Sequence, residues 1–346
     1  MKEKRNGNVE AFRTVLMAGI VALHILGHGH LLELSSGPAE KVLWLIESLA
    51  YPSVNCFVII TGYYQSQNSF KLHKVISLMA QMLFWSIGCY CIYLLAGGVN
   101  TWKGMLQTLL PWLVGDSWFA IVYLALYLVS PFLNAFIQNT NQKQMMKTTA
   151  VLVVFGCAPV LSDKLGIYAM TLPWFVALYF VGAMLRMDMP KRRPLAWGSL
   201  FVLGVAGLWL SRITSFPGQS FAVSNLFWRY NSFAVLGAAV AAFLLVLWCP
   251  VRTWPKWVYG VSGVTFGIYL IHDHADLRQI IWDRWVSALL PAQITLKDIW
   301  LMPALLLVIF IVCALMESGR KRFFSALHAE ELFFKLTENI KMRLNK

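Results

Sequence analysis

The chain has 346 residues, of which 58% are hydrophobic and only 13% are charged. A soluble domain is about half apolar and about a quarter charged, so this composition excludes an ordinary soluble protein and indicates a polytopic membrane protein. The formal net charge of +13 would suit nucleic-acid binding by its size. The basic residues are nevertheless distributed as a membrane topology signal, described below, and we predict no nucleic-acid partner.

The first apolar run carries two ionisable residues, Arg13 and His24. A membrane segment normally excludes such groups, because burying one unpaired charge costs several kcal/mol. Their separation corresponds to roughly three helical turns, so both lie on one helix face about 16 Å apart. The pair predicts a cation at the membrane edge and an imidazole near the bilayer midplane. The alternative is that Arg13 only anchors the helix end and His24 only bonds a neighbouring helix.

The apolar runs that follow predict an all-α fold, a polytopic transmembrane helical bundle of about ten spans. The first span is read as an uncleaved helix rather than a signal peptide, since more spans follow it. The stretch 101–115 is shorter and broken by Pro111, which predicts an interfacial or re-entrant segment. The expected spans are 12–32, 42–64, 75–97, 118–138, 147–163, 169–187, 195–212, 227–248, 257–275 and 299–318.

The distribution of lysine and arginine predicts the orientation. With a cytoplasmic N-terminus, most of the 29 basic residues, including Lys2, Lys4 and Arg5, fall on the inner side. Both termini are therefore expected in the cytoplasm. Residues 1–318 are expected to form one membrane domain. Residues 319–346 mix aromatic, aliphatic and charged side chains, which predicts a basic amphipathic tail lying on the lipid of the inner leaflet.

Several short motifs inside or next to these spans carry polar or aromatic groups. The pair Thr61-Gly62 closes the second span and lets a ligand or another backbone approach closely. Lys71 and Lys74 follow on the cytoplasmic side and share a helix face, so they could hold phosphates or act only as topology signals. Trp118 opens the fourth span, where interfacial aromatic residues are common.

The ninth span ends in a cluster of polar residues. By the predicted topology His272 lies in the outer half of the membrane, and His274, two residues later, points elsewhere on a helix. Asp273 could orient an imidazole or pair with Arg278. No Cys or His pattern with metal-ligand spacing occurs in the chain, so we predict no metal site.

Together these motifs resemble acyltransferase family 3, the bacterial integral-membrane O-acyltransferases. The resemblance covers about residues 9 to 318, and it has two departures. Thr61 stands where the family usually has serine, and Lys71 and Lys74 stand where many members have arginines, which makes phosphate contacts less bidentate. The motifs in chain order are Arg13 with His24, the run from Phe57 to Tyr63, Trp118-Phe119 with Tyr127 and Pro131, Phe180-Val181-Gly182, and the run from Phe266 to His272.

The resemblance implies transfer of an acyl group, most often acetyl, from cytoplasmic acyl-CoA to a hydroxyl of a cell-surface or lipid-linked polysaccharide. It also implies a multi-pass protein of the bacterial plasma membrane. His24 would act as general base or would carry the acyl group itself, and the residues do not choose between these roles. His272 is a second catalytic candidate.

The other expected site residues serve the acyl donor. Glu10 would fix the guanidinium of Arg13. The donor would be held by Arg13, Lys71, Lys74, Trp118 and Tyr127. Two alternatives remain open: a proton-coupled transporter or flippase of a glycan or lipid precursor, and a structural or polymerase-type protein of polysaccharide assembly. The sequence leaves the acceptor glycan and the oligomeric state unspecified.

Overall fold

The computed structural model describes residues 6–214 and 227–344, and within them the chain is helical. The only strand-like pairing in these ranges is one bridge between Ser35 and Ile294. The all-α prediction is therefore confirmed for the described part of the chain. The expected N-terminal basic residues Lys2, Lys4 and Arg5 lie outside it, as do the last two residues of the tail.

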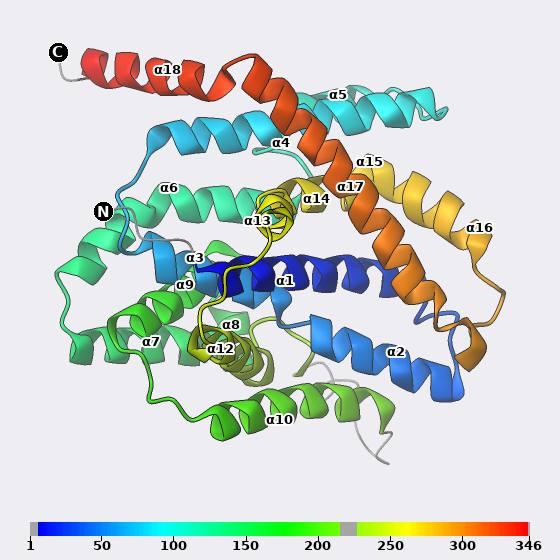
Figure 1. Ribbon diagram of the computed structural model, residues 1–346, viewed down its shortest axis with the longest axis horizontal. Coiled ribbons are helices and arrows are strands. Elements are labelled where there is room, and N and C mark those ends of the chain that lie inside the picture. The colour runs from blue at the N-terminus through cyan, green and yellow to red at the C-terminus, as the bar shows by residue number, and fades with distance from the viewer. Residues whose placement is uncertain (1–5, 215–226, 345–346) are drawn as a thin grey trace.

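The elements follow one another as shown in Figure 1. Most are α-helices; η1 is a π-helix and η2 a short 3₁₀ helix. Their bounds are α1 Gly7–Leu26, α2 Gly37–Ala50, α3 Ser53–Gln65, α4 Leu72–Leu95, α5 Trp102–Leu109, α6 Trp118–Gln138, α7 Gln142–Cys157, α8 Pro159–Lys164, α9 Leu172–Met187, α10 Pro194–Ile213, α12 Phe233–Trp248, α13 Lys256–Ser262, α14 Thr265–His272, α15 Ala275–Arg278, η1 Gln279–Val286, α16 Ser287–Leu289, η2 Leu296–Asp298, α17 Leu301–Ala326 and α18 Ala329–Leu344.

Six helical segments in the described residues are long and apolar enough to cross a membrane, and the apolar helices α9 and α12 are shorter. Each of the ten expected spans overlaps at least one helix. The expected span 42–64 is divided into α2 and α3 at Pro52, which has no backbone N–H to continue the helical hydrogen bonds. The segments of membrane-spanning length are Gly7–Leu26, Gly37–Gln65, Leu72–Leu95, Trp118–Gln138, Pro194–Ile213 and Leu296–Ala326.

Helix α1 lies in the middle of the molecule and packs against α2, α3, α12, α13, α14 and α17 (Figure 1). Helix α3 behind it is packed closely against α9. A Cβ atom at Gly62 would overlap the carbonyl of Tyr179, and one at Gly182 would overlap the carbonyl of Ile59. Gly62 therefore serves helix packing, and the partner that approaches it closely is the backbone of α9.

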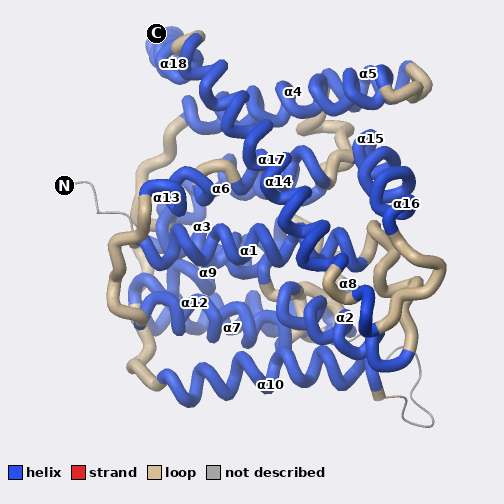
Figure 2. Tube along the Cα trace, turned by 45° about the vertical axis from the view of Figure 1, so that its right-hand side comes forward, coloured by secondary structure: helices blue, strands red, loops and turns tan. Residues whose placement is uncertain are grey.

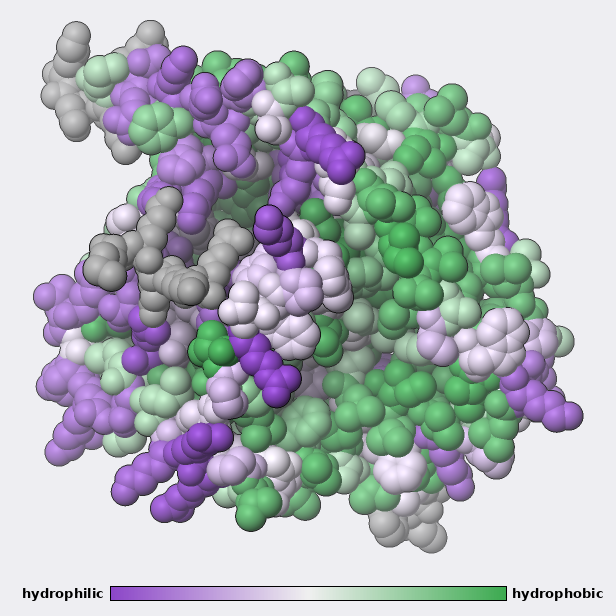
Figure 3. All heavy atoms as spheres, viewed as in Figure 1, coloured by the Kyte–Doolittle hydropathy of each residue, from purple (hydrophilic) through white to green (hydrophobic). Residues whose placement is uncertain are grey.

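The outer elements form the rim of the bundle, with α10 on one side and α4, α17 and α18 on the other (Figure 2). Helix α17 continues to Ala326, so the expected domain boundary at residue 318 falls inside a helix. Helix α18 packs against α4. The middle of α17 exposes Leu307, Val308 and Val312, and apolar residues gather over the right-hand part of this face while polar ones gather at its left (Figure 3). Such apolar exposure is what lipid contact requires.

Candidate functional site

Helix α1 places the first site residue, His24, closer to the helix end than we expected. The sequence predicts a span from 12 to 32, whereas α1 runs from Gly7 to Leu26. The side chain of Asn6 accepts a hydrogen bond from the Asn8 N–H and caps the helix early, and Gly27 ends it. His24 therefore lies in the last turn of α1 and not in the middle of the helix, and its depth in the membrane stays a prediction.

His24 is joined to His272 of α14 by a hydrogen bond. Their Nδ1 and Nε2 atoms are 2.8 Å apart, and the second nitrogen of His272, Nδ1, lies 2.6 Å from the carbonyl oxygen of Ile268. A carbonyl only accepts, so the Nδ1 of His272 carries the proton and its Nε2 has the lone pair. The Nδ1 of His24 must then donate. A neutral His24 ring is thus left with its lone pair on Nε2.

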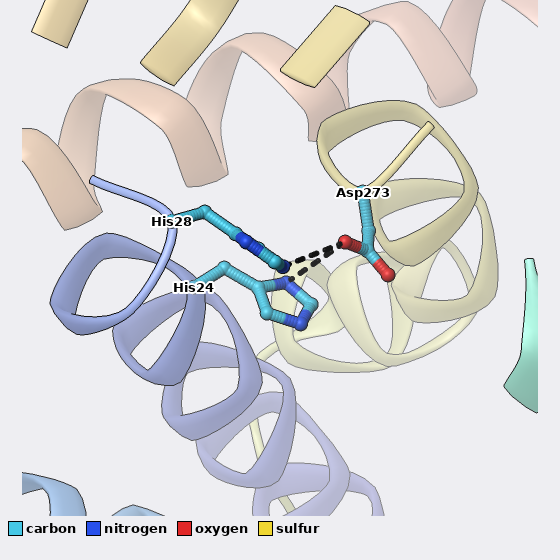
Figure 4. Close-up of side chains that lie close together, drawn as sticks. All are labelled: His24, His28 and Asp273. Carbon is cyan, nitrogen blue, oxygen red and sulfur yellow. Dashed lines mark ion pairs between the residues drawn. The ribbon is translucent and has the colours of Figure 1, made fainter. Parts of the chain in front are cut away.

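Figure 4 shows Asp273 beside His24 and His28, with Nε2 of the His24 ring pointing away from the carboxylate oxygen that both histidines face. The Oδ1 atom of Asp273 lies 3.7 Å from the Nδ1 of His24 and 3.7 Å from the Nε2 of His28. The same oxygen accepts from the Nη2 of Arg278 at 2.7 Å. Asp273 is buried and its other oxygen, Oδ2, has no partner among the described residues. The side chain is held at the C-terminal end of α14 by its ion pair with Arg278.

One group of residues has the composition of a metal site. His24, His28 and Asp273 place one donor atom each within 4.8 Å of one another. Two of these atoms already have partners, because the Nδ1 of His24 binds His272 and the Oδ1 of Asp273 binds Arg278. A cation here would also lie beside a guanidinium. We interpret the group as a hydrogen-bond and ion-pair network, and the absence of a metal stays a prediction.

A cavity of about 480 Å³ runs along α1 and joins several of the expected site residues. Its volume is within the range of about 300–1,000 Å³ of small-molecule sites. Arg13, His24 and Trp118 line it, which confirms that Arg13 and His24 share one face of α1. His272 lies behind His24, fully buried. His274 lies beyond the end of α14, as the N-cap of α15, and faces a smaller, separate hollow; the expectation that it shares a helix with His272 is wrong.

Glu10 supports Arg13 from outside the cavity. Its Oε1 lies 3.6 Å from the Nη1 of Arg13, and its Oε2 accepts a short hydrogen bond from the hydroxyl of Ser262. Ser262 is the last residue of α13, so Glu10 fastens α1 to that helix and also orients the guanidinium. The expectation that Glu10 lies next to Arg13 is confirmed, and its functional role stays a prediction.

Three expected donor-binding residues do not line the cavity. Lys71 is the residue before α4, and Tyr127 packs its ring on Phe70, 5.5 Å between centroids. Lys74 lies in the first turn of α4, on the same face as Leu78 and Gln81, which do line the cavity. Lys74 thus continues that cavity wall toward the end where α1 begins.

The sequence analysis missed Glu317, a fully buried acid in α17. Its oxygens accept hydrogen bonds from Gln81 at 3.0 Å and Trp85 at 2.6 Å, and they pair with Arg320 at 2.6 Å. A Cβ at Gly267 would overlap its carboxylate, so the glycine of the ninth-span motif makes room for it. A carboxylate at the end of a long apolar run is the signal that could have found it.

A bundle of apolar helices in which His24 and Arg13 line one internal cavity is typical of an integral-membrane protein with a small-molecule site between its helices. The comparison with protein families identifies its class: a family model described as an acyltransferase domain matches residues 6–317. The chain therefore belongs to acyltransferase family 3 and is an acyltransferase. No curated protein and no solved structure matches it significantly.

Proposed function

We propose that this protein is an O-acyltransferase that moves an acyl group, most often acetyl, from cytoplasmic acyl-CoA to a hydroxyl of a cell-surface or lipid-linked polysaccharide. The observation that carries the proposal is the cavity that joins Arg13 to the unpaired Nε2 side of His24. A thioester bound at one end of this cavity would meet a base at the other.

The proposal includes ten spans in a bacterial plasma membrane with both termini in the cytoplasm. Two findings support it. Each expected span coincides with helical structure. Helix α1 begins and α18 ends on the same side of the molecule, at the left of Figure 1, where Lys71 also precedes α4. Basic residues on that side agree with a cytoplasmic face.

On the donor side, the cationic side chains would hold the phosphates of coenzyme A. Arg13 lines the cavity directly, and Lys74 continues its wall along α4, with Lys71 three residues earlier. The separation of Arg13 and His24, about 16 Å by helical rise, suits the long arm that ends in the thioester. Trp118 in the cavity wall and Tyr127 nearer Lys71 would contact that arm or the nucleotide.

On the acceptor side, His24 would act as general base. Its Nε2 takes the proton from the acceptor hydroxyl while the hydroxyl oxygen attacks the acyl carbon. The new C–O bond forms, the C–S bond breaks, and the proton passes from Nε2 to the thiolate, which leaves as free coenzyme A thiol. His272 acts as a positioning residue, because its Nε2 holds the Nδ1 proton of His24 and so keeps the lone pair on the reactive side.

The test is His24→Gln at matched expression, with transfer of labelled acetyl from acetyl-CoA to surface polysaccharide as the measurement. Glutamine keeps the size and a donor for His272 but cannot accept the proton, so transfer should fall by about two orders of magnitude or more. His274→Gln, outside the cavity, is the matched control and should transfer normally.

Two results would contradict the proposal. Near-normal transfer by His24→Gln would remove His24 from the chemistry. A wild-type protein that exports glycan but never moves label would favour the transporter alternative instead.

A further inference from the structure

The lining of the cavity includes a second group of polar residues, which the acyl transfer described above leaves unused. This part of the wall is formed by Glu47 of α2, Tyr51 just after that helix, and Tyr230 just before α12. Helices α2 and α10 lie side by side next to this wall (Figure 1). We propose that this wall, which we call the ring subsite (Glu47, Tyr51 and Tyr230), binds one neutral sugar ring of the acceptor. The inference rests on the proposed function and names its acceptor subsite.

The aromatic part of the ring subsite is rigid. The rings of Tyr51 and Tyr230 stack with centroids 4.5 Å apart and 19° between planes, and Trp118 continues the stack beyond Tyr230 at 6.4 Å. The Tyr51 hydroxyl donates to the carbonyl of Trp228 at 2.9 Å, and Asn55 donates to the carbonyl of Tyr230 at 2.6 Å. A wall fixed in this way loses little freedom when a flat ligand packs on it.

The polar part is the carboxylate of Glu47. Its Oε2 is buried and has no hydrogen-bond partner among the described residues. An unpaired buried acceptor costs about 1–3 kcal/mol, so a donor brought by a ligand would be favoured at this position. Hydroxyl groups are suited to this position, since each donates one hydrogen bond to a carboxylate oxygen.

A second charged group, the guanidinium of Arg212, lies behind Glu47. Arg212 is held between the rings of Trp44 and Trp228, 4.9 Å and 4.8 Å from their centroids. No salt bridge joins it to Glu47 among the described residues, and its Nε atom has no partner there either. Arg212 is not among the residues that line the cavity, so it offsets the charge of Glu47 from behind and leaves the Oε2 atom to a ligand.

The charges around the cavity favour a neutral ligand. A cationic ligand near these groups would be repelled by Arg278, which lines the cavity, and by Arg212 behind Glu47. An anion would face Glu47 and the buried carboxylate of Asp273. A neutral polyhydroxylated ring meets both kinds of group through hydrogen bonds, and its apolar face meets the edges of the stacked aromatic rings.

The binding test uses the purified full chain in lipid nanodiscs, because maltoside detergents carry a sugar headgroup. Calorimetric titration with the methyl glycosides of glucose, galactose, rhamnose and N-acetylglucosamine should show saturable binding of at least one of them. Glucosamine and glucuronate, which carry a charge on the same ring, should bind more weakly. Glu47→Gln should weaken the neutral ligand about tenfold, the loss of one charge-assisted hydrogen bond.

The matched control is Glu40→Gln, on the same helix but outside the cavity, where the new amide oxygen still accepts from Trp44. Glu47→Asp is the second variant, because it keeps the charge and withdraws it from the wall by one methylene; it should also weaken binding. Sugar affinity that is unchanged in both Glu47 variants, stronger binding of glucosamine, or no saturable binding of any neutral probe would overturn the inference.

Activity measured on the same preparations separates the two proposals. Glu47→Gln should raise the KM for the acceptor and leave the KM for acetyl-CoA unchanged. Sugar binding that depends on Glu47, in a wild-type protein that never releases coenzyme A thiol, would refute the proposed function and keep the subsite. Normal acyl transfer with an acceptor KM that both Glu47 variants leave unchanged would refute the subsite alone.

Discussion

Replacing His272 by alanine tests whether this residue sets the reactive side of His24. The hydrogen bond between the two rings is 2.8 Å long, and His272 is fully buried. Without the His272 ring, the Nδ1–H group of His24 loses its hydrogen-bond acceptor. The Oδ1 of Asp273 is 3.7 Å away and already bound to Arg278, so it cannot substitute without movement. The ring is then free to carry its proton on Nε2, where it can no longer act as a base.

The size of the effect follows from this single bond. Leaving one buried donor unpaired costs about 1–3 kcal/mol, and if that cost falls on the reactive tautomer, kcat should drop about 5- to 150-fold. The measurement is transfer of labelled acetyl at saturating donor. The KM for acetyl-CoA should not change, because His272 does not line the cavity.

Two further variants distinguish positioning from general damage. His272→Gln keeps an acceptor for His24 and should recover part of the rate. His274→Ala alters a neighbouring histidine that faces a different hollow, and it should leave kcat near wild type. Equal losses for His272→Ala and His274→Ala, or no loss for His272→Ala, would refute the tautomer reasoning.

Two other predictions concern the donor site and the packing of the bundle. Changing Lys71 and Lys74 together to alanine should raise the KM for acetyl-CoA several-fold at unchanged expression, since two point charges near the phosphates are lost. An unchanged KM would show that both lysines act only as topology signals. Gly182→Ala should lower the thermal unfolding temperature and the yield of folded protein, because the new methyl overlaps the carbonyl of Ile59. Gly207→Ala, where a Cβ meets nothing within 4 Å, is its control, and equal stability of the two variants would contradict the close α3–α9 packing.

Much of the fold could be predicted from local sequence patterns. Apolar runs of about twenty residues predict helices wherever they occur, because a backbone in lipid must satisfy its own hydrogen bonds. Helical periodicity also placed Arg13 and His24 on one face, as the cavity lining confirms. It did not separate His272 from His274, because α14 ends at His272 and His274 caps α15. Where local signals were weaker the prediction was less accurate: α1 begins at Gly7 after the Asn6 cap and ends at Leu26 before Gly27, and this early end places His24 in the last turn.

The contacts that define the site were decided only by tertiary structure. His24 and His272 are 248 residues apart in the chain, and their hydrogen bond depends on how α14 packs against α1. The same holds for Glu317 with Gln81 and Trp85, which come from α17 and α4. A sequence pattern reports which face a residue occupies on its own helix. Which faces meet depends on the packing of helices that are distant in the chain, and periodicity carries no information about that packing.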